Sequence, residues 1–155
     1  MDDFDRFKKH LKASVKPMFV VAEYLYKKGF GVDIKPMRIS PTYEDRMDYV
    51  DDGDLIVYKD DVSYIIEVKC MSREFKTSED WLFPSTIVCA KHSFDNKKVK
   101  PYAYILLNKH HTNAMVIKCS TYKDWFVKTI KDNRYEDVVQ EFYMIDKNKI
   151  EFIEL

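Results

Sequence analysis

The chain carries GDLIVY at residues 53–58 and YIIEVK at residues 64–69, two runs rich in β-branched and aromatic residues. Such runs, bounded by polar segments, are typical of strands. The polar segment between them, KDDV at residues 59–62, predicts a turn that joins the two strands into a hairpin. We therefore expect an antiparallel hairpin within a sheet, with the other elements of the chain around it.

The strand period places different side chains on the two faces of this hairpin. Side chains alternate between faces, so Glu67 and Lys69 share one face while Ile66 and Val68 point into apolar packing on the other. The hairpin can bring Asp54 beside Glu67, although twelve residues separate them in the sequence. The pattern predicts two carboxylates and one ammonium on one face of the sheet.

This set of side chains fits a metal site. Mg²⁺ and Mn²⁺ bind through one or two carboxylates together with waters and substrate phosphates. A neighbouring lysine can orient or deprotonate a water molecule, or neutralise charge that develops on a phosphoryl oxygen. The alternative is structural, because a Glu-x-Lys at the end of a strand is commonly a solvated ion pair of little energetic value.

Apolar spacing and turn residues predict the remaining elements. Residues 3–28 have helical spacing, and Pro17 either kinks one long helix or opens a second helix in its first turn. The other expected elements are strands at residues 30–34, 102–107 and 114–119, a segment at 85–94 that fits a helix or a strand, a helix at 121–131, and a hairpin within 142–155. This order predicts one α/β domain spanning residues 1–155, with helices packed on a mixed sheet.

Composition narrows the class of protein. The chain has 155 residues, 46% of them hydrophobic, which is enough for one domain with a core. Lys+Arg and Asp+Glu number 26 each, and this zero net charge excludes a general basic attraction to nucleic acid or membranes as the main source of affinity. No apolar run approaches the ~20 residues that span a bilayer, and no secretory signal is visible, so we expect a cytoplasmic protein. The separated cysteines (Cys70, Cys89 and Cys119) are expected to be small buried side chains.

Asp54 followed by the tripeptide Glu67-Val68-Lys69, at the edges of two apolar strands, resembles the motif of the PD-(D/E)xK nucleases of the restriction-endonuclease-like superfamily. The resemblance covers roughly residues 15–110, and Gly53 stands where the family commonly has proline. It implies a restriction-endonuclease-like α/β fold, in which helices flank a mixed central sheet, here with a C-terminal helix and hairpin. It also implies a structure-selective endonuclease acting on DNA, similar to small stand-alone Holliday-junction resolvases and phage nucleases, many of which are homodimers.

The resemblance assigns a role to each residue of the motif. Asp54, Glu67 and the main-chain carbonyl of Val68 would hold Mg²⁺, for which Mn²⁺ can substitute. Lys69 would position or activate the attacking water. Family members often carry a further acid on the first helix, and this resemblance singles out Glu23 as a residue that faces the metal.

The alternative for Glu23 is an exposed side chain that pairs with Lys27 one helical turn later.

Charge is unevenly distributed along the chain, since residues 41–61 carry eight acids while residues 90–111 carry five lysines and three histidines. An acidic loop beside the metal, facing a basic flank, would suit a groove that follows phosphates. The alternative is two solvated loops.

Three smaller features of the sequence are each more simply explained by structure than by function. Trp81 and Phe83 can stack on unpaired bases, although covering the edge of a core is commoner. The pair His110-His111 is expected in a turn rather than at a metal, and Trp125 and Phe126 on the late helix are expected in the core.

Two other classes of function stay open. One is a catalytically inactive nucleic-acid-binding or assembly module on the same fold, because one fold hosts many functions. The other is an interaction domain in which Asp54, Glu67 and Lys69 form a surface salt-bridge cluster. A titration with divalent ions separates these classes, since only a metal site predicts a specific thermal shift.

Overall fold

The computed structural model describes residues 2–36, 38–45, 53–131 and 138–155. Two helices open the chain, α1 (Asp3–Ala13) and α2 (Val15–Lys27), and Ser14 separates them. Pro17 stands in the first turn of α2, where its missing N–H breaks no helical hydrogen bond. Of the two alternatives for residues 3–28, a second helix that opens near Pro17 is therefore the one observed.

The central element is a six-stranded sheet of mixed orientation. Its order is β1-β2-β3-β5-β6-β9, and all neighbours are antiparallel except β3 and β5, which run parallel. The strands are β1 (Gly31–Ile34), β2 (Leu55–Lys59), β3 (Val62–Cys70), β5 (Ala103–Leu107), β6 (Asn113–Lys118) and β9 (Glu151–Glu154). The expected strands at residues 30–34, 102–107 and 114–119 are thus confirmed as β1, β5 and β6.

The β2–β3 hairpin is confirmed, and its turn explains the register. Asp60 and Asp61 adopt φ of 51° and 63°, the left-handed pair of a two-residue turn whose twist matches that of the strands. Leu55 then pairs with Ile66, and the register continues to Lys59 opposite Val62.

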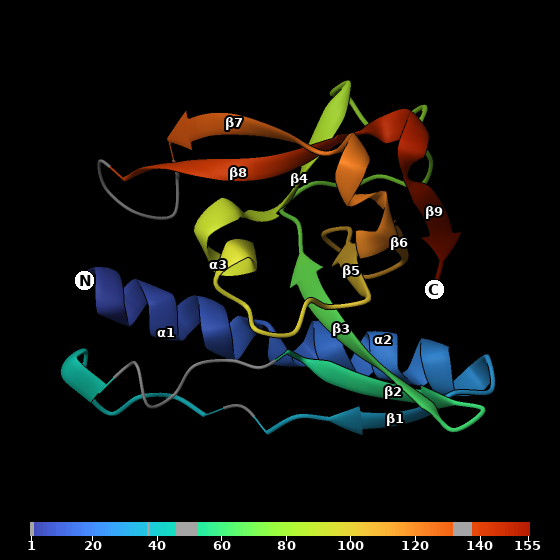
Figure 1. The fold of residues 1–155 in the computed structure, drawn as a ribbon, viewed down its shortest axis with the longest axis horizontal. Coiled ribbons are helices and arrows are strands. Elements are labelled where there is room, and N and C mark those ends of the chain that lie inside the picture. The colour runs from blue at the N-terminus through green and yellow to red at the C-terminus, as the bar shows by residue number, and fades with distance from the viewer. Residues whose placement is uncertain (1, 37, 46–52, 132–137) are drawn as a thin grey trace.

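A second, antiparallel sheet has the order β4-β8-β7. It consists of β4 (Ser85–Ala90), β8 (Val139–Asp146) and β7 (Phe126–Lys131), and the short helix α3 (Lys91–Asp95) follows β4. The ambiguous segment at residues 85–94 is therefore a strand and then a helix. In Figure 1, β4, β8 and β7 lie at the top of the molecule, while α1 and α2 lie lower, beside β2 and β3.

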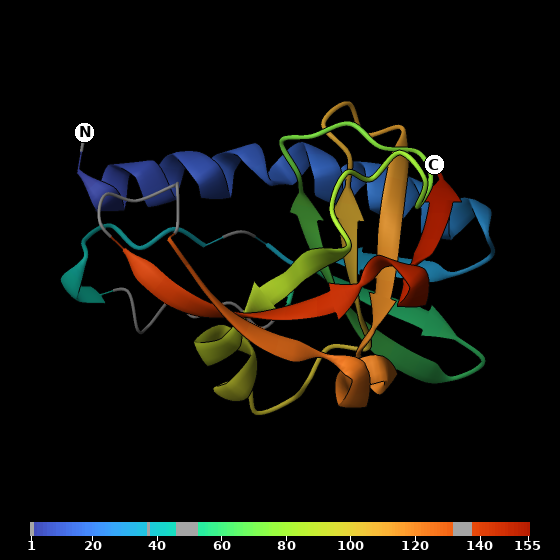
Figure 2. The ribbon, with the colours of Figure 1, turned by 90° about the horizontal axis from the view of Figure 1, so that it is seen from above.

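The two faces of the central sheet bury different side chains. One face packs on α2, where Met18, Val21 and Ala22 join Ile66 and Val68 in one core cluster. The opposite face belongs to a second cluster that combines residues of both sheets, including Val88, Phe94, Tyr104, Leu106 and Ile145. Figure 2 shows α1 and α2 along one side of the molecule and strands of the second sheet toward the other.

Two expectations for the C-terminal third of the chain are wrong. The helix expected at residues 121–131 is a 3₁₀ turn, η2 (Cys119–Asp124), followed by strand β7. Strand β7 pairs with β8 along its whole length, and this non-local pairing overrides the local helix signal at Thr121. The hairpin expected within residues 142–155 is also absent, because η3 (Lys147–Lys149) carries the chain from β8 in one sheet to β9 in the other.

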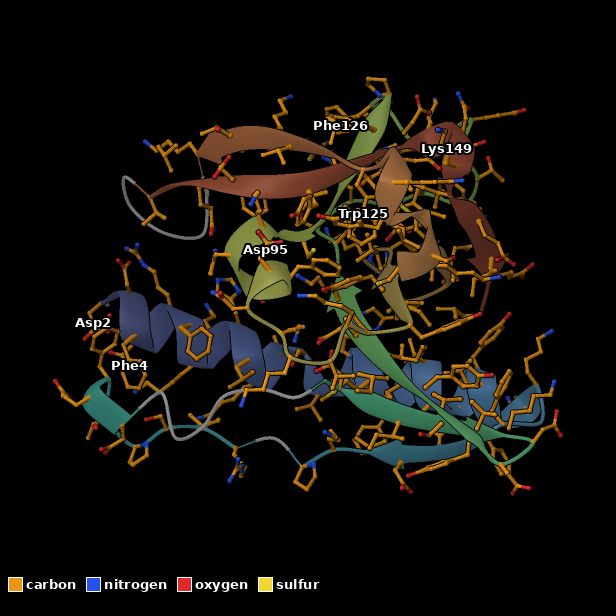
Figure 3. All side chains as sticks on the ribbon, viewed as in Figure 1. Asp2, Phe4, Asp95, Trp125, Phe126 and Lys149 are labelled. Atoms are coloured by element: carbon orange, nitrogen blue, oxygen red, sulfur yellow. The ribbon has the colours of Figure 1, made fainter. Side chains whose placement is uncertain are left out.

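Tertiary packing also separates Trp125 from Phe126. The Trp125 ring lies 5.2 Å from that of Phe94 and 6.4 Å from that of Tyr104, so its expected core position is confirmed. Phe126 is 45% exposed on β7, which contradicts its expected burial. Figure 3 shows Trp125 among the side chains between the sheets and Asp95 on the neighbouring α3.

Among the described residues, no helix combines the length and apolar character needed to cross a membrane.

Candidate active site

Asp54 lies directly before β2 and continues its pairing with β3. Its N–H donates to the carbonyl of Ile66 at 3.2 Å, and its Oδ2 accepts a hydrogen bond from the N–H of Val68 at 2.7 Å. Because Leu55 pairs with Ile66, the next pair in this register sets Asp54 opposite Glu67. The structure therefore brings the first two residues of the motif together.

Glu67 projects from the sheet face that lies away from α2, because its neighbours Ile66 and Val68 fill the core under that helix. Its side chain is only 9% exposed, and its Oε1 lies 2.7 Å from the Nζ of Lys97. The two groups form an ion pair. Among the described residues, no donor makes a hydrogen bond of regular geometry to Oε1. The carboxylate is thus buried, with its charge balanced by an ammonium.

Lys69 shares the face of Glu67 and is exposed. Its Nζ lies 5.7 Å from the centre of the Tyr104 ring, and Tyr104 is the register partner of Glu67 on the parallel strand β5. The ammonium therefore stands above the aromatic floor of the site.

The backbone of Val68 adds a third group to the site. The N–H and the carbonyl of one strand residue point to the same side, and the Val68 N–H points at Asp54. The Val68 carbonyl consequently lies on the same strand edge as the Asp54 carboxylate. This is the position from which a main-chain oxygen can join Asp54 and Glu67 around one cation.

The floor of the site is apolar and excludes water. Burial raises the pKa of the Cys89 thiol, although a hydrogen bond with Tyr104 and the positive charges of Lys69 and Lys97 act in the opposite direction. Burial likewise raises the pKa of the Tyr104 hydroxyl, and its contact with Cys89 acts in the same direction. Both groups are therefore neutral at physiological pH, and charge interactions above them are weakly screened.

Gly53 closes the site on the side of Asp54. Its φ is +116°, and a Cβ added there would lie 2.5 Å from the Cγ2 of Ile65 and 4.0 Å from the Oε1 of Glu67. Glycine is the residue that adopts this conformation without strain, and it is also the one that leaves room for Ile65. The departure from proline at this position thus has a local physical reason.

The position of Glu23 corrects the expectation that it faces the metal. Its side chain is 67% exposed and its Oε1 lies 3.0 Å from the Nζ of Lys27, the alternative of an exposed i,i+4 pair. The physical reason is that α2 packs on the sheet face of Ile66 and Val68, whereas Glu67 projects from the other face. The structure does not bring Glu23 together with the motif.

Lys97 is the site residue that the sequence did not single out. It lies just after α3, thirty residues beyond Glu67, and was counted only as one lysine of a basic segment. No local pattern connects the two residues, because their contact depends on how α3 packs over the central sheet.

The wider charge pattern is less suited to a phosphate groove than expected. Lys91 forms an ion pair with Asp95 at 2.6 Å, and the Lys100 ammonium donates to the carbonyls of Phe94 and Asp95. Since Lys97 is paired with Glu67, three of the five lysines in the basic segment have partners within the protein. Lys98 and Lys109 are exposed. Three of the acids expected beside the metal (Asp48, Asp51 and Asp52) lie outside the described residues.

The smaller features divide between core and surface. Trp81 is buried and donates to the carbonyl of Ser85 at 3.1 Å, so it covers the core, whereas Phe83 is exposed. His110 and His111 lie in a turn, as expected, and the His111 Nε2 contacts the Cys70 Sγ at 3.3 Å.

The three cysteines differ from one another. Cys89 is buried as expected and Cys119 is partly buried, but Cys70 is exposed, which contradicts the expectation for it.

The donor set of the site suits a hard divalent cation. Among the described residues, no group of three or more His, Cys, Asp and Glu side chains could hold a metal ion. Asp54 and Glu67 with one main-chain carbonyl instead match the sparse protein ligation of Mg²⁺, which keeps waters and substrate oxygens as its other ligands. The buried Oε1 of Glu67, which lacks a regular hydrogen bond, has room in its bonding for such a cation.

Comparison of the chain with protein-family models, with curated proteins and with solved structures finds no match. What the chain itself establishes is a mixed α/β protein with a central sheet of mixed strand orientation. The candidate active-site residues Asp54 and Glu67 lie where β2 begins.

Proposed function

We propose that this protein is a Mg²⁺-dependent nuclease that hydrolyses phosphodiester bonds in DNA as a structure-selective endonuclease. The observation that carries the proposal is the pair Asp54 and Glu67, set side by side where β2 begins. The Glu67 carboxylate is largely buried. Buried carboxylates in proteins are paired with a cation or coordinate a metal ion, and such groups are common at functional sites.

The chain order supports a restriction-endonuclease-like core. Helix α2 precedes the antiparallel strands β1, β2 and β3, and β5 then runs parallel to β3 on the far side from β2. The motif resemblance expects this order of helix, strand and hairpin around Asp54 and Glu67. Between β3 and β5 the chain forms β4 and α3 of a second layer, which covers the face of the site.

The residues of the chain would divide the work as follows. Asp54, Glu67 and the Val68 carbonyl would hold the divalent ion at the beginning of β2. The bound ion would supply Lewis-acid chemistry, making water nucleophilic at neutral pH and offsetting charge on the phosphoryl oxygens. Lys69, exposed on the same face, would position or activate the attacking water.

A catalytically inactive nucleic-acid-binding module is the second candidate. The observation that favours it is the Glu67–Lys97 ion pair, because a carboxylate with an internal counter-ion needs no metal for charge balance. A surface salt-bridge cluster is a poorer explanation, since both partners of this pair are largely buried, at 9% and 17% exposure.

The test is a cleavage assay on branched, flapped, single-stranded and duplex DNA, with Mg²⁺ or with a chelator, and metal affinity from calorimetry. Glu67→Gln should lose both Mn²⁺ binding and cleavage, because one ligand loses its charge. Lys69→Ala should keep Mn²⁺ binding and cleave on the order of a hundredfold more slowly. Lys98→Ala removes a neighbouring exposed lysine and serves as the charge control.

Each result separates the candidates. A wild-type protein that binds DNA but neither binds divalent ions nor cleaves would favour the inactive module. Cleavage of RNA alone would keep the metal site and change the substrate class. A wild-type rate for Glu67→Gln would end the nuclease proposal.

A further inference from the structure

We propose that Lys97 is a tethered counter-ion of this site, which occupies Glu67 until a divalent cation displaces it. Binding of the divalent cation to Glu67 and release of the Lys97 side chain from Glu67 are then coupled. The inference rests on the proposed metal site, and it adds a residue and a regulatory step that the nuclease motif does not contain.

The contact itself is close and shielded from water. The Lys97 Nζ lies 2.7 Å from the Glu67 Oε1, and the two side chains are 17% and 9% exposed. Among the described residues, that oxygen receives no regular hydrogen bond, so the ammonium is the group that balances the charge at Oε1. Removing such a partner from a buried pair leaves an uncompensated charge, which is strongly destabilising.

The Lys97 ammonium and a divalent ion would compete for the same carboxylate. An ammonium at hydrogen-bond distance from Oε1 would stand within a few ångströms of a divalent ion bound to Glu67 and Asp54, where like charges repel strongly in a poorly screened environment. A divalent ion therefore binds only when Lys97 leaves. A hydrated cation carries enough charge to replace it, so the buried carboxylate stays balanced in both states.

The local structure lets Lys97 leave without unfolding its surroundings. It follows the last turn of α3, where its N–H donates to the carbonyl of Phe94 at 3.2 Å and so fixes the backbone. Lys100 holds the same end of α3 through the Phe94 and Asp95 carbonyls. The Lys97 side chain can thus rotate about its four-carbon stem toward solvent while the helix end stays in place.

This exchange makes two predictions that a purely structural ion pair does not. Metal alone, without DNA, should increase the solvent exposure of the Lys97 amine. Removal of the ammonium should also tighten metal binding, because the cation no longer competes with a resident charge. A structural pair would instead lose affinity or stay unchanged when Lys97 is replaced.

The first experiment uses the wild-type protein. An amine-reactive reagent labels lysines with and without Mn²⁺, and mass spectrometry measures each site. Labelling of Lys97 should rise severalfold with Mn²⁺, while Lys98, its exposed neighbour, should keep a constant rate. Unchanged labelling of Lys97 in protein that binds Mn²⁺ by calorimetry would overturn the inference and leave the metal site standing.

The second experiment compares Lys97→Met with Lys98→Met, which makes the same change in charge one residue along the chain. Lys97→Met should bind Mn²⁺ about tenfold more tightly or better, and should gain more thermal stability from Mn²⁺ than the wild type. Lys98→Met should match the wild type in both. Weaker or equal Mn²⁺ binding by Lys97→Met would refute the exchange.

The outcomes distinguish this inference from the proposed function. If the wild type and both variants bind no divalent ion, the proposed metal site fails and the inference fails with it. If the wild type binds Mn²⁺ and only the Lys97 measurements disagree, the inference alone fails. Labelling of the wild type decides the matter if Lys97→Met does not fold.

Discussion

Replacement of Asp54 by asparagine and by alanine separates its structural role from its proposed role at the metal. The Asp54 Oδ2 accepts the Val68 N–H at 2.7 Å in a half-buried position. Asparagine keeps an oxygen at this place and loses the charge, whereas alanine removes the acceptor altogether. The two variants should therefore fail in different ways.

The expected magnitudes follow from this one hydrogen bond. A hydrogen bond to a charged group contributes about 1.5–3 kcal/mol, and alanine would also leave the Val68 N–H without its partner. We expect Asp54→Ala to lower the free energy of unfolding by about 2 kcal/mol. For a chain of this length that corresponds to roughly 4–8 °C in Tm. Asp54→Asn should lose about 1 kcal/mol or less, because a neutral hydrogen bond remains.

The assays are urea denaturation monitored by tryptophan fluorescence, Mn²⁺ calorimetry and single-turnover cleavage. Both variants should lose Mn²⁺ binding and cleavage, while DNA binding persists or tightens because an acid near the phosphate path is gone. Asp54→Asn that is as stable as the wild type yet inactive would show that charge, and not folding, is lost. Cleavage by Asp54→Asn at the wild-type rate would refute the metal-ligand role, and an Asp54→Ala variant of undiminished stability would refute the structural one.

Three further predictions concern other parts of the chain. Gly53→Ala should lower the free energy of unfolding by about 1–3 kcal/mol in urea denaturation, because alanine is strained at the φ of +116° and its Cβ collides with the neighbouring strand. Gly31→Ala should be nearly neutral, because the nearest atom to a Cβ added there lies at 3.6 Å. Equal losses of stability in the two variants would contradict this explanation. Glu23→Gln should leave the cleavage rate unchanged, since its carboxylate is exposed and ion-paired on α2, and a large loss of rate would return it to the site. In native protein at pH 8, a thiol reagent should label Cys70 faster than Cys89, because Cys70 is exposed whereas Cys89 is buried. Equal rates would mean that the second sheet opens readily.

The late part of the chain shows why local signals were insufficient there. Thr121 and its neighbours carry a helix-start pattern, yet residues 126–131 form β7 because β8 offers a full set of hydrogen-bonding partners. Strand β8 in turn pairs with β4, more than fifty residues earlier in the chain. Non-local pairing of this kind depends on which apolar faces meet in three dimensions, and a local propensity of a few tenths of a kcal/mol per residue does not resist it.

The sequence by itself determined the β2–β3 hairpin and the place of Asp54 beside Glu67. Both follow from short-range rules, since a two-residue turn sets the register and strand parity sets the face. Only the tertiary structure decided which face of the sheet the helices cover, and hence that Glu23 lies away from Glu67. It also decided that Lys97 reaches Glu67, because an ion pair between segments thirty residues apart exists only once α3 has packed over the sheet and removed water from between the two charges.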